Sequence, residues 1–242
     1  MVLAVSTLGC PGLPLDRVGA LLRRHGVTGV QLRCAGDEPV HVGLGTRERR
    51  KTRRQLAGDG LTLTGLATYV DLSAGATGLQ AHLDLAYDLG APALRLMPGD
   101  GDPTAALATA VERARGSGVR LMIETHDAYL RGADLRRVLE SFPEIGAIWD
   151  ALHPWRAGEE PAETAAALGS RLAEVQIKDV PSRNDRTPLV PGTGAIPLGD
   201  VLARSGNVPV VLEHEARWHP GAAPIDDAIA GATALLRSSA RL

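Results

Sequence analysis

Short apolar runs alternate along the chain with longer segments whose apolar residues recur every three or four positions. The short runs are typical of buried strands, and the longer period is typical of amphipathic helices. The predicted strands span residues 2–6, 28–32, 61–69, 93–97, 119–124, 145–150, 172–178 and 208–213. The predicted helices span residues 15–24, 46–58, 78–89, 103–116, 135–140, 161–168, 198–204 and 225–237, with Thr46 as the expected cap of the second.

The order of these elements predicts the fold. Strict alternation of strand and helix indicates parallel strands joined by right-handed crossovers. The chain has 242 residues, the usual length of one (β/α)8 barrel. The sequence GCPG at residues 9–12 is not the glycine-rich fingerprint that follows the first strand of a dinucleotide-binding open sheet. We therefore predict an α/β protein in which residues 1–242 form a single TIM-barrel domain.

Composition fits this prediction. Hydrophobic residues make up 44% of the chain but aromatic residues only 3%, so the core must consist mainly of Leu, Val, Ala and Ile. Such a core is expected for parallel strands buried on both faces. Cys10 and Cys34 are the only cysteines, too few for a disulfide scaffold or a cysteine-based zinc site. We interpret them as buried free thiols.

Charge and hydropathy exclude several classes of partner. The formal net charge of −2 gives no electrostatic footprint for nucleic acid or an anionic membrane. No apolar run has transmembrane length, and residues 1–9 lack the basic region of a secretory signal, so we expect a cytoplasmic protein. The basic run at residues 47–54 lies on a predicted outer helix, where it forms a solvated face or a contact in a homo-oligomer. The expected partner is a small-molecule substrate.

Polar residues follow four consecutive predicted strands, where each strand ends. Carboxyl ends of barrel strands carry the catalytic residues of TIM-barrel enzymes. Side chains two positions apart on a strand share a face, so the second member of a pair lies one layer nearer the solvent. These strand-end residues are Glu124 with His126, Asp150 with the later His153, Gln176 with Lys178, and Glu213 with Glu215.

Three carboxylates that lie close together need a compensating cation. Carboxylate and amide oxygens are hard ligands, which suit Mg²⁺ or Mn²⁺ better than a soft metal. The sequence therefore predicts a divalent metal at Glu124, Asp150, Gln176 and Glu213. The alternative is that each acid pairs with a basic neighbour such as Arg33, Arg95 or Lys178.

The motifs IETH, IWDALH, VQIKD, VPGTGAIPL and VVLEHE, in this order and spacing, resemble those of the xylose isomerase-like barrels, the sugar phosphate isomerases and epimerases. The resemblance covers essentially the whole chain. It implies a divalent metal held by Glu124, Asp150, the position of Gln176, and Glu213. It also implies that the two glutamates transfer protons and that His153 lies beside metal and substrate.

The sequence departs from the family at two positions. The family has a histidine in an HxKD motif where this chain has Gln176, which binds transition metals less well than imidazole. Either the site still holds Mn²⁺ or Mg²⁺, or Zn²⁺, with His126 or His153 completing the shell, or the metal is lost. Thr193 stands between two glycines where many relatives carry an acid, which leaves that loop's contact with ligand open.

The predicted function is a metal-dependent isomerase or epimerase, or a related lyase, that acts on a sugar, polyol or polyol-like carbonyl compound through an enediolate. Glu124 and Glu213 would move the proton, with His126, His153 and Lys178 assisting. We expect Arg33, Arg95 and Glu215 to bind the substrate. One alternative is a metal-independent acid–base enzyme, such as a dehydratase or cyclase of specialised metabolism. Another is a non-catalytic ligand-binding barrel, which does not require the matched pair of glutamates.

Overall fold

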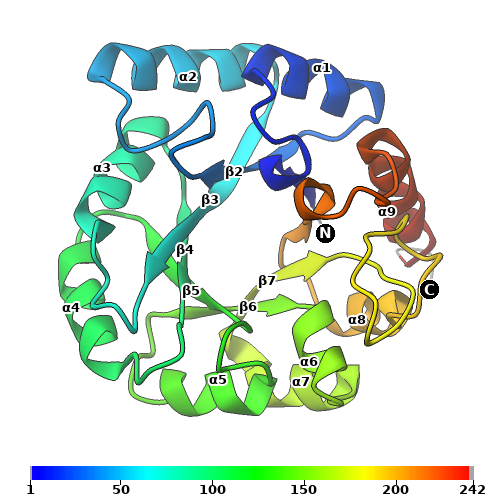
Figure 1. The fold of residues 1–242 in the computed structure, drawn as a ribbon. Helices are drawn as coiled ribbons and strands as arrows, with labels where there is room; N and C mark the ends of the chain where they lie inside the picture. The colour runs from blue at the N-terminus through cyan, green and yellow to red at the C-terminus, as the bar shows by residue number, and fades with distance from the viewer. Residues whose placement is uncertain (1, 240–242) are drawn as a thin grey trace.

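The computed structural model describes residues 2–239 and contains a closed barrel of parallel strands (Figure 1). Each strand pairs with the next in the chain, and β1 pairs with β8 to close the barrel. The predicted (β/α)8 fold is therefore confirmed. The strands are β1 Leu3–Ser6, β2 Gly29–Cys34, β3 Thr62–Asp71, β4 Ala93–Met97, β5 Arg120–Glu124, β6 Gly146–Asp150, β7 Leu172–Ile177 and β8 Val210–Leu212.

An outer ring of helices surrounds the barrel, and α9 lies beside α1 where the ring closes (Figure 1). Each expected helix is present, with bounds that differ from the prediction by a few residues at most. The helices are α1 Leu15–Arg24, α2 Thr46–Gly58, α3 Leu79–Leu89, α4 Thr104–Ala114, α5 Gly132–Leu139, α6 Leu152–Arg156, α7 Pro161–Leu168, α8 Leu198–Arg204 and α9 Ile225–Ser239.

Two local predictions were wrong. Thr46 is the first residue of α2, whose N-cap is Gly45, because the Glu48 side chain accepts the Gly45 N–H at 2.8 Å. No helix was predicted between the strand at residues 145–150 and the helix at residues 161–168, but this segment contains the short helix α6. Pro154 lies in the first turn of α6, where a missing N–H breaks no helical hydrogen bond.

The interior has an apolar layer beneath a polar one. Met122 and Ile148 form a small buried cluster with Ala93 and Ala173. Two residues further along β5 and β6 come Glu124 and Asp150, also buried. The larger apolar core joins strands to the surrounding helices, including the buried cysteines that the sequence predicted. Among residues 2–239, no helix is both long and apolar enough to cross a lipid bilayer.

Candidate active site at the carboxyl end of the barrel

Acidic side chains from three strands converge at one end of the barrel. Glu124 ends β5, Asp150 ends β6, and Glu213 directly follows β8. One carboxylate oxygen from each lies within 4.8 Å of the others, and all three side chains are buried. The structure therefore brings together the three acids that the strand ends indicated.

Arg95, in β4, joins the two glutamates of this cluster. Its Nη1 donates to Oε2 of Glu124 and to Oε1 of Glu213, each at 2.8 Å. Burial raises the pKa of Glu124 to about 7; the charge of Arg95 opposes this shift, and that of Glu213 adds to it. Glu124 can therefore either hold or release a proton near neutral pH.

Lys178 lies among the remaining oxygens. Its Nζ is 2.7 Å from Oδ2 of Asp150 and 2.5 Å from both Oε2 of Glu213 and Oε1 of Glu215. Although burial disfavours its charge, the Asp150 and Glu213 carboxylates hold the pKa of Lys178 well above its ordinary value. Burial likewise disfavours the charge of Asp150, but Lys178 holds the pKa of that carboxyl below its ordinary value. Ion pairing with Arg95 and Lys178, the alternative to a metal, is thus present in the cluster.

Gln176 has its amide held in a fixed direction. It is the register partner of Asp150 across β6 and β7. Its Nε2 donates to Oε1 of Glu174 at 3.4 Å, and the same oxygen accepts from Nε2 of Gln31 at 2.8 Å. Gln176 Oε1 is buried and has no hydrogen-bond partner among residues 2–239. A buried oxygen without a donor is unfavourable, so this atom is suited to a bound ion or ligand.

Two histidines lie beside Glu124. The ring centroids of His126, which follows β5, and His153, in α6, are 4.5 Å apart. His126 Nδ1 is 2.6 Å from Oδ1 of Asp127, whose other oxygen accepts the Gly99 N–H at 3.0 Å. His153 Nε2 is buried without a partner in the described part of the chain. Burial lowers the pKa of His153 to about 4 against the opposing charge of Asp150, so the ring is neutral at physiological pH.

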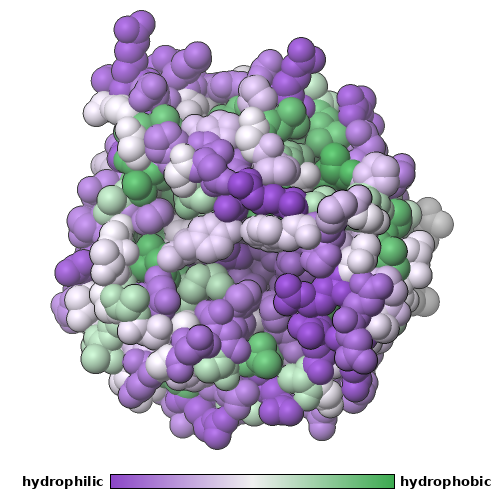
Figure 2. Space-filling view, in the orientation of Figure 1, coloured by the Kyte–Doolittle hydropathy of each residue, from purple (hydrophilic) through white to green (hydrophobic). Residues whose placement is uncertain are grey.

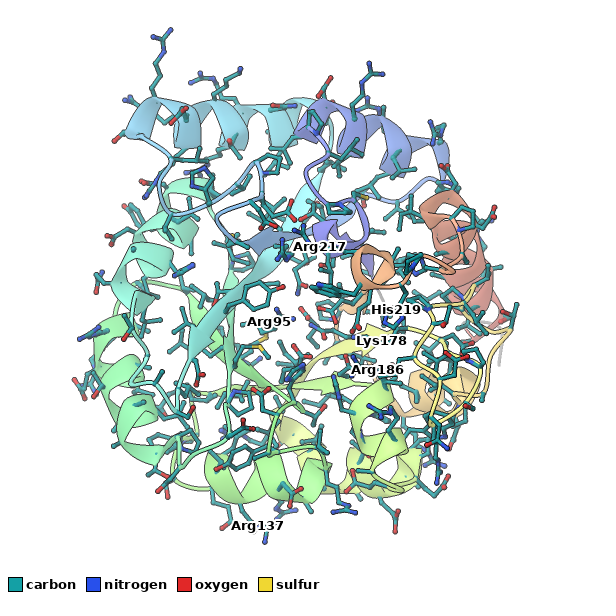
Figure 3. The ribbon with its side chains drawn as sticks, viewed as in Figure 1. Arg95, Arg137, Lys178, Arg186, Arg217 and His219 are labelled. Atoms are coloured by element: carbon teal, nitrogen blue, oxygen red, sulfur yellow. The ribbon has the colours of Figure 1, made fainter. Side chains whose placement is uncertain are left out.

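A cavity of about 440 Å³ opens over this cluster, a volume suited to a small molecule. Figure 2 shows the hollow near the middle of this face, bordered by hydrophilic side chains. In Figure 3, Arg95, Lys178, Arg186, Arg217 and His219 gather around this centre, whereas Arg137 lies at the periphery. The lining residues are Leu8, Tyr69, Asp71, Arg95, Met97, Glu124, His126, Asp127, His153, Arg186, Glu213, Glu215 and Trp218.

The expected substrate-binding residues differ in position. Arg95 and Glu215 line the cavity. Arg33 does not; its Nη1 donates to Oε1 of Glu38 at 2.5 Å, and its Nε donates to the Tyr69 hydroxyl at 2.8 Å. Arg33 therefore does not line the cavity itself, but its hydrogen bond positions Tyr69, which does.

The long loop between β7 and α8 is fixed by Asp179. Its Oδ2 accepts the N–H groups of Gly192 and Gly194 at 2.8 and 2.9 Å. Its Oδ1 accepts the N–H of Ile196 at 3.2 Å. The two glycines that flank Thr193 thus use their N–H groups within the protein, and the close approach of Gly194 to Asp179 leaves no room for a Cβ atom.

Several residues of the site were not predicted. Asp127 holds His126, and Glu174 holds Gln176. A signal for Glu174 existed, because a carboxylate in the middle of the apolar run LAEVQI needs a buried partner. Asp127 could not be identified in this way, because its distinguishing feature, a positive φ of 50°, is visible only in the structure.

The residues present fit a divalent metal. Glu124, Asp150 and Glu213 offer converging carboxylate oxygens, and Gln176 offers an unpartnered amide oxygen. Four oxygen ligands form a hard set of the kind that binds Mg²⁺ or Mn²⁺. Arg95 and Lys178 supply only two fixed cations to four carboxylates, those of the three acids and of Glu215.

The model of a protein family described as xylose isomerase-like TIM barrel matches residues 20–238. No curated protein matches the chain by sequence. Solved structures match over nearly the whole length. The chain is similar to the probable 3-DHS dehydratase AsbF, involved in petrobactin synthesis, from Bacillus anthracis, with a TM-score of 0.82, 16% identity, and coverage of 98% of this chain and 99% of that one.

Two further structures extend this picture. An L-ribulose 3-epimerase matches with a TM-score of 0.78 and 16% identity, over 100% of this chain and 96% of that one. The IOLI protein, whose structure has a binding zinc atom, matches with a TM-score of 0.79 and 14% identity, over 100% of this chain and 99% of that one. At these identities the likeness establishes the fold alone.

Proposed function

The chain belongs to the xylose isomerase-like TIM barrel family, and we propose that it is an enzyme that moves a proton beside the carbonyl group of a small sugar, polyol or polyol-like substrate. One observation carries this proposal: Glu124 and Glu213 share Arg95 Nη1 at 2.8 Å each, and all three side chains line one cavity. Two buried carboxylates tied to one guanidinium can exchange a proton with a substrate between them. Similarity to an L-ribulose 3-epimerase supports this class of reaction.

The two glutamates have the chemistry that proton transfer requires. A general base works best when its pKa lies near the working pH, and the pKa of Glu124 is raised to about 7. In the proposed reaction, one glutamate removes the proton from the carbon next to the carbonyl. Return of the proton by the other glutamate gives an epimer, and return to the neighbouring carbon gives an isomer. His126 and His153, which line the cavity, would hold the substrate's hydroxyl groups, and Lys178 would act through the carboxylates that it contacts.

Glu124, Asp150, Gln176 and Glu213 would hold a divalent ion, with Mn²⁺ or Mg²⁺ fitting their oxygen ligands and Zn²⁺ as a further candidate. When bound, such an ion supplies a Lewis acid that polarises the substrate carbonyl and stabilises the enediolate. Arg95 would keep both glutamates in place, because its one nitrogen contacts both carboxylates.

A second candidate is a metal-independent dehydratase or related acid–base enzyme on the same barrel. Lys178 favours it, because an ammonium group already contacts Asp150 and Glu213 at 2.7 and 2.5 Å. In that enzyme, Lys178 or a histidine would protonate a departing hydroxyl while Glu124 removes the proton. Similarity to the probable 3-DHS dehydratase is consistent with this chemistry.

Solvent deuterium exchange tests the proposal without requiring the natural product. The protein, loaded with Mn²⁺ or Mg²⁺, would be incubated in D₂O with L-ribulose and a panel of ketopentoses and ketohexoses, and followed by NMR. We expect deuterium at the carbon next to the carbonyl, and loss of that exchange with a chelator. Chelator-resistant exchange or water loss would favour the second candidate. Absence of exchange across the panel, with metal bound, would contradict the proposed sugar substrate class.

A further inference from the structure

We propose that Glu124, His126 and His153 form a second metal site, which takes a nitrogen-preferring transition metal such as Zn²⁺ or Co²⁺. One carboxylate oxygen of Glu124 and one ring nitrogen of each histidine lie within 4.8 Å of one another. All three side chains line the cavity, so an ion from solution can reach them. This site goes beyond the proposed function and shares only Glu124 with the oxygen-rich cluster.

The binding atoms can be identified. Arg95 Nη1 donates to Oε2 of Glu124 at 2.8 Å, so Oε1 is the oxygen of this carboxylate that would bind the second ion. His153 Nε2 is buried and has no hydrogen-bond partner in the same residues. The two imidazole rings meet edge to face, with an interplanar angle of 65° and centroids 4.5 Å apart. Small side-chain rotations would bring the nitrogens to the 2.0–2.1 Å distances typical of zinc.

Asp127 provides a second, independent indication. Metal-binding histidines commonly donate their other ring N–H to a carboxylate, which fixes the tautomer and the ring direction. His126 Nδ1 contacts Asp127 Oδ1 at 2.6 Å, which leaves Nε2 as the free nitrogen. Asp127 is itself fixed by the Gly99 N–H at 3.0 Å, and its backbone has a positive φ of 50°, which is uncommon for a residue other than glycine. The strained backbone thus holds a carboxylate behind the histidine.

The two sites differ in ligand chemistry. The oxygen-rich cluster suits Mg²⁺ or Mn²⁺, whereas two imidazoles and one carboxylate suit Zn²⁺ or Co²⁺. Glu124 belongs to both groups of candidate ligands, so its carboxylate would contribute to both sites. The three protein ligands of the second site would leave coordination positions open to water or substrate.

Cobalt binding tests this inference with a readout that is independent of activity. The protein, expressed without a metal-binding tag, would be stripped with chelator and dialysed against Co²⁺, and bound metal and visible absorption would be measured. We expect two Co²⁺ per chain in the native protein, and one in His126→Ala and in His153→Asn. Asp150→Asn should also bind one Co²⁺ but keep the visible band of nitrogen-coordinated cobalt. His82→Ala is the matched control, because His82 lies on α3 and its Nδ1 is 3.0 Å from the Gly78 carbonyl at the start of that helix.

Each outcome separates this inference from the proposed function. An unchanged Co²⁺ count and visible band in both His126→Ala and His153→Asn, whether the native protein binds one ion or two, would overturn the second site. Folding of each variant would be checked by circular dichroism, and His126, which is partly exposed, provides the milder change. Mn²⁺ binding to the double histidine variant reports the oxygen-rich cluster alone. If the double histidine variant does not bind Mn²⁺, this result would contradict the proposed metal enzyme, independently of the cobalt measurements.

Discussion

The ammonium nitrogen of Lys178 lies 2.7 Å from Oδ2 of Asp150, and both side chains are buried at the carboxyl end of the barrel. The same nitrogen contacts Glu213 and Glu215 at 2.5 Å. This lysine is therefore the internal counter-ion of a carboxylate cluster that also fits a divalent metal. Lys178 and a metal ion would bind some of the same carboxylate oxygens. Without Lys178, the stability of the protein should therefore depend more strongly on bound metal.

Lys178→Met should destabilise the metal-free protein by about 3 to 5 kcal/mol, because it leaves buried carboxylates without their partner. Added Mn²⁺ should restore part of the lost stability, because in the variant no ammonium group competes with the ion for the carboxylate oxygens. Urea unfolding with chelator and with Mn²⁺ measures both effects. Lys51→Met, on the exposed face of α2, is the same substitution at a solvated position and should change stability by less than about 0.5 kcal/mol. Equal effects at both positions would contradict a special role for Lys178.

Glu124→Gln and Glu213→Gln should each reduce the rate of deuterium exchange by about 100- to 10,000-fold, the usual contribution of a general acid or base. Both replacements keep size and remove the charge. Glu112→Gln on α4, where the carboxylate pairs with exposed Arg115, should leave the rate unchanged. Wild-type exchange in both active-site variants would rule out proton transfer by the glutamates.

Glu174 should make folding stability depend on pH. Burial raises its pKa to about 7 from 4.5, against hydrogen bonds from Gln31 and Gln176 that oppose the shift. Between pH 4.5 and 7 only the folded state holds the proton, so this residue's contribution to stability falls as pH rises through that window. Glu174→Gln should therefore be more stable than the native protein at pH 8, by up to about 3 kcal/mol, and show no gain below pH 4.5.

The difference between the two proteins reports Glu174 together with its charge interaction with Glu124. The pKa of Glu124 is also raised, so the stability contribution of Glu124 likewise falls as pH rises. The pKa of His153 is lowered to about 4, so the stability contribution of His153 increases as pH rises. Both remain in the variant. Chemical unfolding from pH 4 to 8 measures the difference, and a constant offset across this range would show that Glu174 keeps its ordinary pKa.

Gln176→His should increase the affinity for Zn²⁺ at least tenfold, because imidazole is a better ligand for transition metals than an amide oxygen. Binding would be followed by competition with a zinc indicator in the His126→Ala background, which removes a ligand of the second site. Gln80→His, on the exposed side of α3, adds the same side chain away from the barrel and should have no effect. An unchanged zinc affinity in Gln176→His would mean that position 176 does not contact the ion.

Asp179→Asn should loosen the loop between β7 and α8. The replacement substitutes an NH₂ group for one of the oxygens that accept the N–H groups of Gly192, Gly194 and Ile196. We expect faster cleavage in this loop by limited proteolysis. Asp200→Asn, an exposed acid paired with Arg204 on α8, is the control and should be cut at the native rate. Equal cleavage of both variants would show that Asp179 does not hold the loop.

The alternation of apolar runs predicted the barrel because parallel strands with both faces buried leave a pattern that is local in sequence. The same pattern placed Glu124, Asp150 and Glu213 at strand ends, and the carboxyl ends of barrel strands share one face of the molecule. The helix α6 escaped prediction because Pro154 indicates a loop unless it lies in a first turn, which is decided by the surrounding chain.

The order of strands and helices and the acids at the strand ends could be predicted from local sequence patterns. The contacts that each buried charge makes depend on the folded arrangement. Arg95 contacts Glu124 and Glu213, whereas Arg33 turns to Glu38 and Tyr69, although both arginines lie in barrel strands. The periodicity of a strand fixes the face of a residue, but the partner of a buried charge depends on distances of a few ångströms between segments remote in sequence.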